Sequence, residues 1–134
     1  MARLVDTSVL IAIERRGGTV AQLGDLPDGP FVVSVVSIAE MLFGMHLADS
    51  ARRRLARQAF IDRVVDEFSP LPFDLVAARI YARVWNELRA SGSMIGVHDL
   101  QIGATALALG YDVLTLNVRD FERIPGLLVR RPGW

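Results

Sequence analysis

Three acids and one amide stand in the sequence where buried elements are expected to begin or end. Asp6 directly follows Leu4 and Val5, which have the apolar character of a buried strand, and it precedes residues with the pattern of a helix. In open α/β sheets, ligands bind at the carboxyl ends of the strands. Asp6 is therefore the first candidate for a role in chemistry.

Glu40 and Asp99 are the next two candidates, because the helical faces that they share are too apolar for solvated acids. Residues three and four positions apart lie on one face of a helix, which puts Val36 and Phe43 beside Glu40, and Ile95 beside Asp99. Taken singly, either acid is explained equally well by the helix dipole, which favours negative charge in the first turn.

The fourth stretch is Thr115–Phe121, where Asn117 and Asp120 follow an expected strand over residues 113–116. Asn117 is also an ordinary turn residue, and Asp120 is also a helix cap. His46 and His98 are interpreted as surface or core histidines rather than ligands. In a parallel sheet the carboxyl ends of the strands meet at one edge, so Asp6, Glu40, Asp99 and the pair Asn117 and Asp120 are expected to lie together.

Carboxylates brought together raise each other's pKa and repel one another unless a cation lies between them. A site made of oxygen ligands suits Mg²⁺, or Mn²⁺ in its place. Such a metal ion lowers the pKa of a bound water and holds a phosphodiester for in-line attack. The four stretches together therefore predict metal-dependent cleavage of a phosphate ester.

Strand and helix patterns alternate along the chain, which predicts right-handed βαβ units on a parallel sheet. Ser37 is expected to cap the helix over residues 37–47, with Glu40 in the capping-box position, and Asp74 is expected to cap the helix over 74–90. Pro27–Pro30 is a break. The expected strands are 3–6, 31–35, 113–116 and an extended piece over 127–129. The expected helices are 8–16, 37–47, one that starts at Asp49 or Ser50 and ends at 67, 74–90 and 97–109.

Composition narrows the class of protein. The chain has 134 residues, of which 51% are hydrophobic, which predicts a single α/β domain over residues 1–134. It has no cysteine, so disulfide scaffolds and thiolate zinc sites are excluded and a reducing cytoplasm is expected. Residues 31–48 are apolar but contain Ser34, Glu40 and His46, so we expect a soluble protein without a membrane span.

The charged residues are informative in two ways. All fifteen basic residues are arginine, which excludes Walker A sites, receiver domains and haloacid dehalogenases, because each depends on a lysine. The formal net charge is zero, so any binding of nucleic acid must rest on local patches of arginine. The candidates are Arg15, Arg16, Arg52, Arg53, Arg54 and Arg57.

Four motifs in this order resemble the PIN-domain ribonucleases, and more narrowly the VapC toxins of type II toxin–antitoxin systems. The motifs are L-V-D-T-S at 4–8, S-x-x-E at 37–40, I-G-x-H-D-L-x-I at 95–102 and L-T-x-N-x-x-D-F at 114–121. The resemblance implies a three-layer α/β/α, flavodoxin-like fold with a central parallel sheet. It also implies a Mg²⁺-dependent endoribonuclease that leaves a 5′ phosphate and a 3′ hydroxyl.

The resemblance assigns Asp6 and Asp99 as direct metal ligands, while Glu40 binds the metal through water or orients the nucleophile. Many PIN domains carry aspartate at the position of Asn117, so the resemblance leaves open whether Asn117 or Asp120 is the fourth site residue. Thr7 and Ser8 match hydroxyls near the metal in this family.

The resemblance also implies a homodimer held by a VapB-type antitoxin. The candidate residues for the antitoxin groove are Phe43, Leu47, Leu55 and Phe60. Two other function classes remain open from the residues alone. One is a catalytically silent module that binds RNA or a partner, and the other is a metal-dependent nuclease or phosphatase acting on DNA or a small ester.

Overall fold

A four-stranded parallel sheet forms the centre of the molecule in a computed structural model that describes residues 2–24 and 29–134. The strand order is β2-β1-β3-β4, and β1 pairs in parallel with both β2 and β3. The strands are β1 (Arg3–Val5), β2 (Phe31–Val33), β3 (Asp112–Leu114) and β4 (Val129–Arg130). Residues 27 and 28 of the expected break lie outside the described residues.

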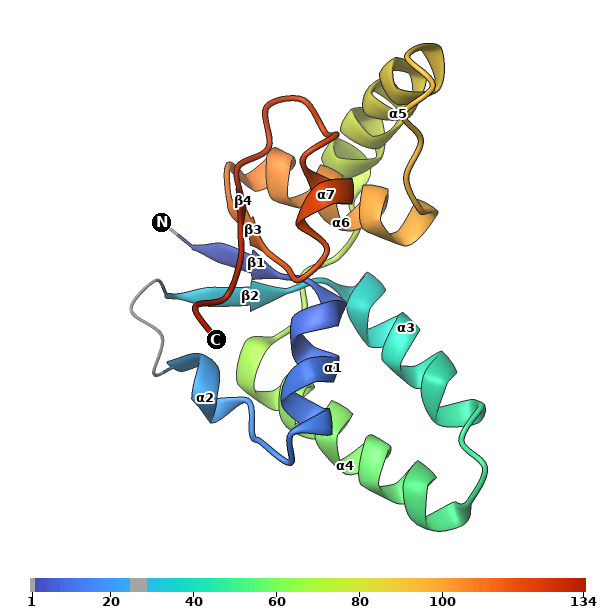
Figure 1. The fold of residues 1–134 in the computed structure, drawn as a ribbon, viewed down its shortest axis with the longest axis vertical. Coiled ribbons are helices and arrows are strands. Elements are labelled where there is room, and N and C mark those ends of the chain that lie inside the picture. The colour runs from blue at the N-terminus through green and yellow to red at the C-terminus, as the bar shows by residue number, and fades with distance from the viewer. Residues whose placement is uncertain (1, 25–28) are drawn as a thin grey trace.

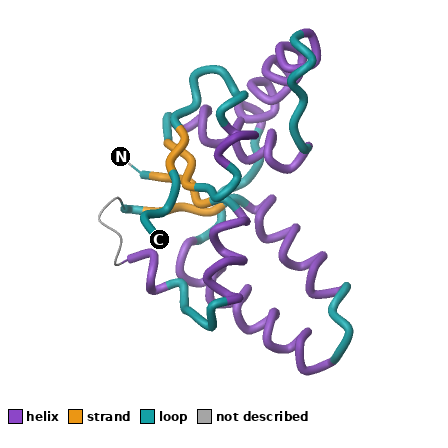
Figure 2. Tube along the Cα trace, in the orientation of Figure 1, coloured by secondary structure: helices purple, strands orange, loops and turns teal. Residues whose placement is uncertain are grey.

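Seven helices of the described residues connect these strands and cover both faces of the sheet (Figure 1). In Figure 2, α1, α3 and α4 lie on one side of the strands, while α5, α6 and α7 lie on the other. The helices are α1 (Thr7–Arg15), α2 (Ala21–Gly24), α3 (Val35–His46), α4 (Ala51–Phe68), α5 (Leu75–Ala90), α6 (Val97–Leu109) and α7 (Val118–Phe121).

Alternate side chains of each strand point into two separate cores, because successive residues of a strand face opposite sides of the sheet. Val5 and Leu114 pack with the buried side chains of α1, α3 and α4. Leu4 and Val113, their neighbours in sequence, pack with those of α5, α6 and α7. These two cores confirm the three-layer α/β/α arrangement.

Most helix starts agree with the sequence prediction. The side chain of Asp74 accepts a hydrogen bond from the Ala77 amide at the start of α5, and Ser50 does the same for the Arg53 amide in α4. Helix α6 ends at Gly110, whose φ of 70° is in the left-handed region that glycine tolerates. The last two strands are shifted from their predicted positions, since β3 ends at Leu114 and β4 begins at Val129.

The predicted capping box at Ser37 is wrong. Ser34 is the N-cap of α3 and accepts a hydrogen bond from the Val36 amide, so Ser37 lies inside the first turn and is fully buried. Val35 and Val36 are poor helix formers by propensity and continue the apolar run of β2, which concealed the true start of the helix. No helix of the described residues is both long and apolar enough to cross a membrane.

Candidate active site

The candidate site lies at the carboxyl ends of β1 and β3, which are neighbours in the sheet. The order in which the chain adds strands reverses between these two. From β1 the chain crosses to β2 on one side, and later returns past β1 to β3 on the other. Such a switch point is where open α/β sheets form a crevice. Asp6 follows β1 and Thr115 follows β3, and the Asp6 amide donates to Leu114 O at 2.9 Å.

Asp6 is only 2% exposed, and its two carboxylate oxygens have different environments. Oδ2 accepts hydrogen bonds from the hydroxyls of Ser8 at 2.7 Å and Thr115 at 2.8 Å, and a longer one from the Ser8 amide at 3.4 Å. Oδ1 is buried and has no hydrogen-bond partner among the residues that the structure describes. A buried carboxylate oxygen without a partner is unfavourable, so this oxygen is available for a cation.

Glu40 is brought to Asp6 through Thr7, the next residue along the chain. The Thr7 hydroxyl lies 2.8 Å from Glu40 Oε1, to which it donates, and 2.8 Å from Ser37 Oγ. The second oxygen, Glu40 Oε2, is 3.5 Å from His98 Nδ1. Glu40, His98 and Asp99 line a hollow of about 330 Å³ that also includes Gly96 and Val97.

Asp99 joins the cluster from α6 and contacts the loop after β3. Asn117 Nδ2 donates to Asp99 Oδ2 at 3.0 Å and to Asp120 Oδ2 at 3.0 Å. Partial burial raises the pKa of Asp99 to about 6, with further contributions from the negative charges of Asp6, Glu40 and Asp120, while the Asn117 hydrogen bond lowers it. The acids are thus close enough to act on one another's ionisation.

A close approach between α6 and the chain after α7 supports this position of Asp99. Gly103 shares a helical face with Asp99, and a Cβ at Gly103 would collide with the Ile124 side chain. Because glycine has no Cβ, α6 packs directly against Ile124. Asp99 and Asn117 are therefore within hydrogen-bond distance.

The structure brings together all five residues that the sequence predicted for the site, and it separates the acids from the neutral Asn117. Asp6, Glu40 and Asp99 form the acid cluster, whereas Asn117 is a neutral bridge that joins Asp99 to Asp120. In the residues that the structure describes, no three His, Asp or Glu side chains are arranged to hold one metal ion. The all-oxygen donor set and the unpartnered Asp6 Oδ1 nonetheless fit a hard cation.

Three polar residues of the site were not identified from the sequence. The Thr115 hydroxyl donates a hydrogen bond to Asp6 and accepts one from the backbone amide of Asn117 at 2.8 Å. The Ser37 hydroxyl lies against that of Thr7. The signal for Thr115 was its place at the end of an apolar strand, the same signal that identified Asp6. His98, interpreted as structural, lies beside Glu40.

Comparison with known proteins assigns the class of this fold and site. Residues 3–127 match the family model described as PIN domain, and the chain belongs to this family. It is 39% identical over 129 residues to ribonuclease VapC1 of Rickettsia felis, covering 96% of this chain and 95% of that relative. It is also 29% identical over 132 residues to the tRNA(fMet)-specific endonuclease VapC of Shigella flexneri, covering 98% and 96%.

A solved structure has the same architecture. The chain matches VapBC-5 from Mycobacterium tuberculosis, a member of the VapBC family of toxin–antitoxin systems, with a TM-score of 0.79 and 31% identity over 98% of both chains. Within the PIN-domain proteins the chain is therefore a VapC ribonuclease, the toxin of a VapBC toxin–antitoxin system. This assignment confirms the prediction from the motifs and favours the ribonuclease over the silent module and over a DNA nuclease or phosphatase.

Proposed function

We propose that this VapC ribonuclease hydrolyses RNA with Mg²⁺, or Mn²⁺ in its place, and leaves a 5′ phosphate and a 3′ hydroxyl. One observation carries the proposal above all others: Asp6 Oδ1 is buried without a hydrogen-bond partner beside other carboxylates. A carboxylate oxygen kept out of water in this way is stabilised by a cation. We further propose that residues 1–134 act as one domain, and that the protein acts in the cytoplasm, where its RNA substrates are found.

Asp6 and Asp99 would hold the metal ion, with Glu40 binding it directly or through water. Ser8 and Thr115 hold Asp6 Oδ2 by two short hydrogen bonds, so the carboxylate is fixed with Oδ1 as its available oxygen. Thr7 fixes Glu40 in the same way. The bound cation supplies Lewis acidity that activates water and neutralises the charge of the phosphodiester.

Asn117 and Asp120 share the fourth position of the site. The side-chain amide of Asn117 orients Asp99 and Asp120 by donating one hydrogen bond to each. It adds no charge to a cluster that already contains several acids. Asp120 supplies the carboxylate that many PIN domains have at the position of Asn117. We therefore assign Asn117 a positioning role and Asp120 an electrostatic one.

The second part of the proposal is a cognate VapB-type antitoxin and a homodimer of this chain. Phe43, Leu47 and Leu55 are 65%, 68% and 71% exposed, an unusual state for large apolar side chains on the helix pair α3 and α4. Phe60 is 7% exposed and belongs to the core, so it is removed from the antitoxin groove. A second exposed apolar group on α5, which includes Leu75, Val76 and Trp85, is available for dimer contacts.

A nuclease assay on purified protein tests the proposal. The substrates would be tRNA, which the Shigella flexneri relative is named for, an unstructured RNA, a matched single-stranded DNA and a generic phosphate ester. We expect RNA cleavage that EDTA abolishes and Mg²⁺ restores, with 5′ phosphate ends on the products. Cleavage in EDTA, or equal cleavage of DNA, would overturn the proposal.

A further inference from the structure

A second hollow runs along α1 and begins beside the acid cluster. It has a volume of about 490 Å³ and is lined by Ser8, Ile11, Ala12, Arg15, Arg16 and Leu116. We call it the α1 groove. No acidic residue is among those that line it, whereas Glu40 and Asp99 line the hollow described above.

The near end of the α1 groove is one hydrogen bond away from Asp6. Ser8 Oγ donates to Asp6 Oδ2 at 2.7 Å, and the Leu116 amide donates to Ser8 Oγ at 3.1 Å. Ser8 and Leu116 therefore form both the edge of the candidate active site and the start of the groove. A polymer whose phosphodiester lies at the acids has the α1 groove as an adjacent path.

The far end of the α1 groove is cationic. Arg15 and Arg16 are exposed and, within the described part of the chain, are the only charged residues that line it. No carboxylate of the described residues forms an ion pair with either of them. Since the chain has no net charge, two arginines that form no ion pair with a carboxylate of the described residues are a local feature rather than the result of a basic surface.

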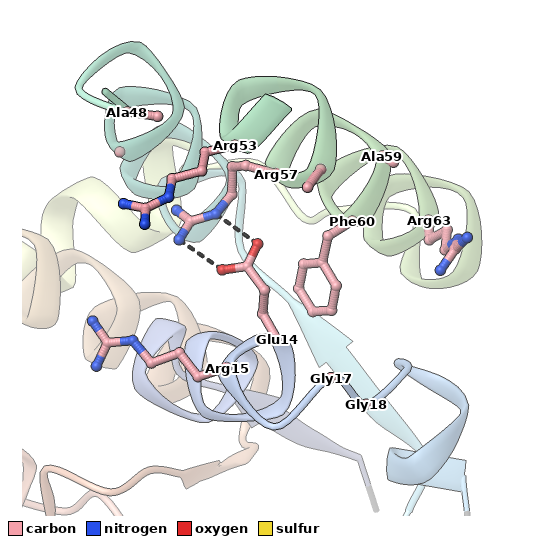
Figure 3. Close-up of a pocket in the computed structure, with 12 residues that line it drawn as sticks. Glu14, Arg15, Gly17, Gly18, Ala48, Arg53, Arg57, Ala59, Phe60 and Arg63 are labelled. Atoms are coloured by element: carbon pink, nitrogen blue, oxygen red, sulfur yellow. Dashed lines mark hydrogen bonds and ion pairs between the residues drawn. The ribbon is translucent and has the colours of Figure 1, made fainter. Parts of the chain in front are cut away.

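A larger cavity between α1 and α4, which Arg15 also lines, provides a contrast (Figure 3). There Arg57 Nε donates to Glu14 Oε2 at 2.7 Å, and Arg57 Nη2 lies 2.6 Å from Glu14 Oε1. The charges of the acid and the base therefore neutralise each other. Arg53 is likewise paired with Asp49 at 3.2 Å, and Arg54 donates to Ala48 O. Figure 3 shows the Arg15 side chain extending away from the Glu14–Arg57 pair.

Arg16 is held in place by an aromatic ring. Its guanidinium carbon lies 4.2 Å from the centre of the Trp134 ring, which is a cation–π contact. Arg16 and Trp134 border a smaller hollow of about 280 Å³ together with Ile13 and Gln22. One guanidinium thus separates the α1 groove from the hollow at Trp134. The aromatic contact orders an exposed arginine that would otherwise sample many rotamers.

We propose that the α1 groove binds the RNA strand on one side of the scissile bond, that Arg15 and Arg16 contact its phosphates, and that Trp134 is a positioning residue for Arg16. This inference rests on RNA as the substrate of the acid cluster. From Ser8 to Arg15, α1 rises by about 10 Å, the length of about three stacked nucleotides. The groove is thus a binding site for roughly three nucleotides.

The test uses four variants of the full chain: Arg16→Ala, Trp134→Ala, Trp134→Phe and, as a matched control, Arg83→Ala. Arg83 is an exposed arginine on α5 that does not line the groove. On an RNA with at least four nucleotides on each side of the cleaved bond, Arg16→Ala and Trp134→Ala should raise KM roughly threefold to tenfold with little change in kcat. Trp134→Phe should retain most of the affinity because it keeps an aromatic ring.

Two further measurements separate binding from catalysis. In an Asp99→Asn background, fluorescence anisotropy gives the Kd for RNA over a range of salt concentrations. Loss of one phosphate contact should reduce the slope of log Kd against log salt by about 0.7. RNAs shortened to one nucleotide on the 5′ or the 3′ side should reveal which flank occupies the groove, because on one of them the Arg16→Ala effect should disappear.

Several outcomes would overturn the inference. It is wrong if Arg16→Ala behaves like Arg83→Ala, if both Trp134 variants leave KM unchanged, or if Arg16→Ala has the same effect on every shortened RNA. A loss of affinity for an antitoxin with no change in RNA binding would assign the groove to a protein partner. These outcomes differ from failure of the proposed function, in which the unsubstituted chain itself would lack Mg²⁺-dependent cleavage.

Discussion

The Asn117 side chain joins Asp99 to Asp120 through one amide nitrogen that lies 3.0 Å from a carboxylate oxygen of each. A neutral amide therefore occupies the position between two acids. Its hydrogen bond lowers the pKa of Asp99, while the charge of Asp120 raises it. The two residues after β3 thus act on the same carboxyl group in opposite directions.

This opposition predicts shifts of opposite sign in the pH profile of cleavage. Asn117→Ala removes the hydrogen bond and should raise the pKa of Asp99, so the acidic limb of kcat/KM should move to higher pH. Asp120→Asn removes a negative charge and should move the limb to lower pH. The pH dependence of kcat/KM at fixed Mg²⁺ measures both, and shifts in the same direction would contradict these roles.

Asp99→Asn should reduce RNA cleavage by at least about 100-fold while the protein stays folded, because the variant removes the charge proposed to bind the metal but keeps the shape of the side chain. Circular dichroism and thermal melting check the fold, and a gel assay on RNA checks cleavage. The Arg83→Ala variant, expressed and purified in the same way, serves as the control. Retained cleavage would remove Asp99 from the mechanism.

Asp6→Asn should leave the Tm in EDTA unchanged or raised, because it removes a buried charge from a cluster of acids and still offers an oxygen to Ser8 and Thr115. Asp6→Ala should lower the Tm, since both hydroxyls then lose their acceptor. Thermal melting with and without Mg²⁺ measures these changes. A large fall for Asp6→Asn in EDTA would make Asp6 a structural hydrogen-bonding residue.

The raised pKa of Asp99 also predicts how stability depends on pH without metal. The pKa of Asp99 is raised to about 6 in the folded chain from the 3.8 of an ordinary aspartate, so between these values the folded state retains a proton that the unfolded state has lost. The free energy of unfolding contributed by this group is present below about pH 4 and is lost as the pH rises to about 6. The melting temperature in EDTA should therefore fall over this range more for the natural chain than for Asp99→Asn, and parallel curves would contradict the prediction.

The Glu14–Arg57 pair links α1 to α4, and its side chains are about four-fifths buried, with relative exposures of 20% and 22%. Glu14→Ala should reduce the free energy of unfolding by roughly 1–3 kcal/mol, because it leaves a largely buried guanidinium without its carboxylate partner. Chemical denaturation measures this, with Asp62→Ala as the control, an acid on the exposed face of α4. Equal effects would reduce the Glu14–Arg57 pair to a surface contact.

The sequence was sufficient to predict the parallel sheet and three acids that the structure places close together, while their role in chemistry stays a prediction. Asp6, Glu40 and Asp99 were recognisable because each interrupts an apolar pattern, and that mismatch is visible in one dimension. The start of α3 was not predicted, since Val35 and Val36 continue the apolar run of β2 and conceal the cap at Ser34. Local propensity does not determine where a strand turns into a helix when both are buried.

Contacts that depend on side-chain packing were also beyond the sequence. Thr115 and Ser37 are small polar residues in buried runs, and nothing in their spacing relates them to Asp6 or Thr7 before the strands are paired. His98 was interpreted as structural because neighbouring residues do not reveal that α3 and α6 meet at Glu40. The pairing of Arg16 with Trp134 spans most of the chain.

The place of β3 in the sheet limits when this enzyme becomes dangerous to the cell that makes it. Since β3 lies next to β1, the carboxylates of residues 6, 40 and 99 and the hydroxyl at 115 come together only after almost the whole polypeptide has left the ribosome. A nascent chain that ends before this point lacks the complete candidate site. The candidate site is therefore among the last parts of the molecule to be completed during synthesis.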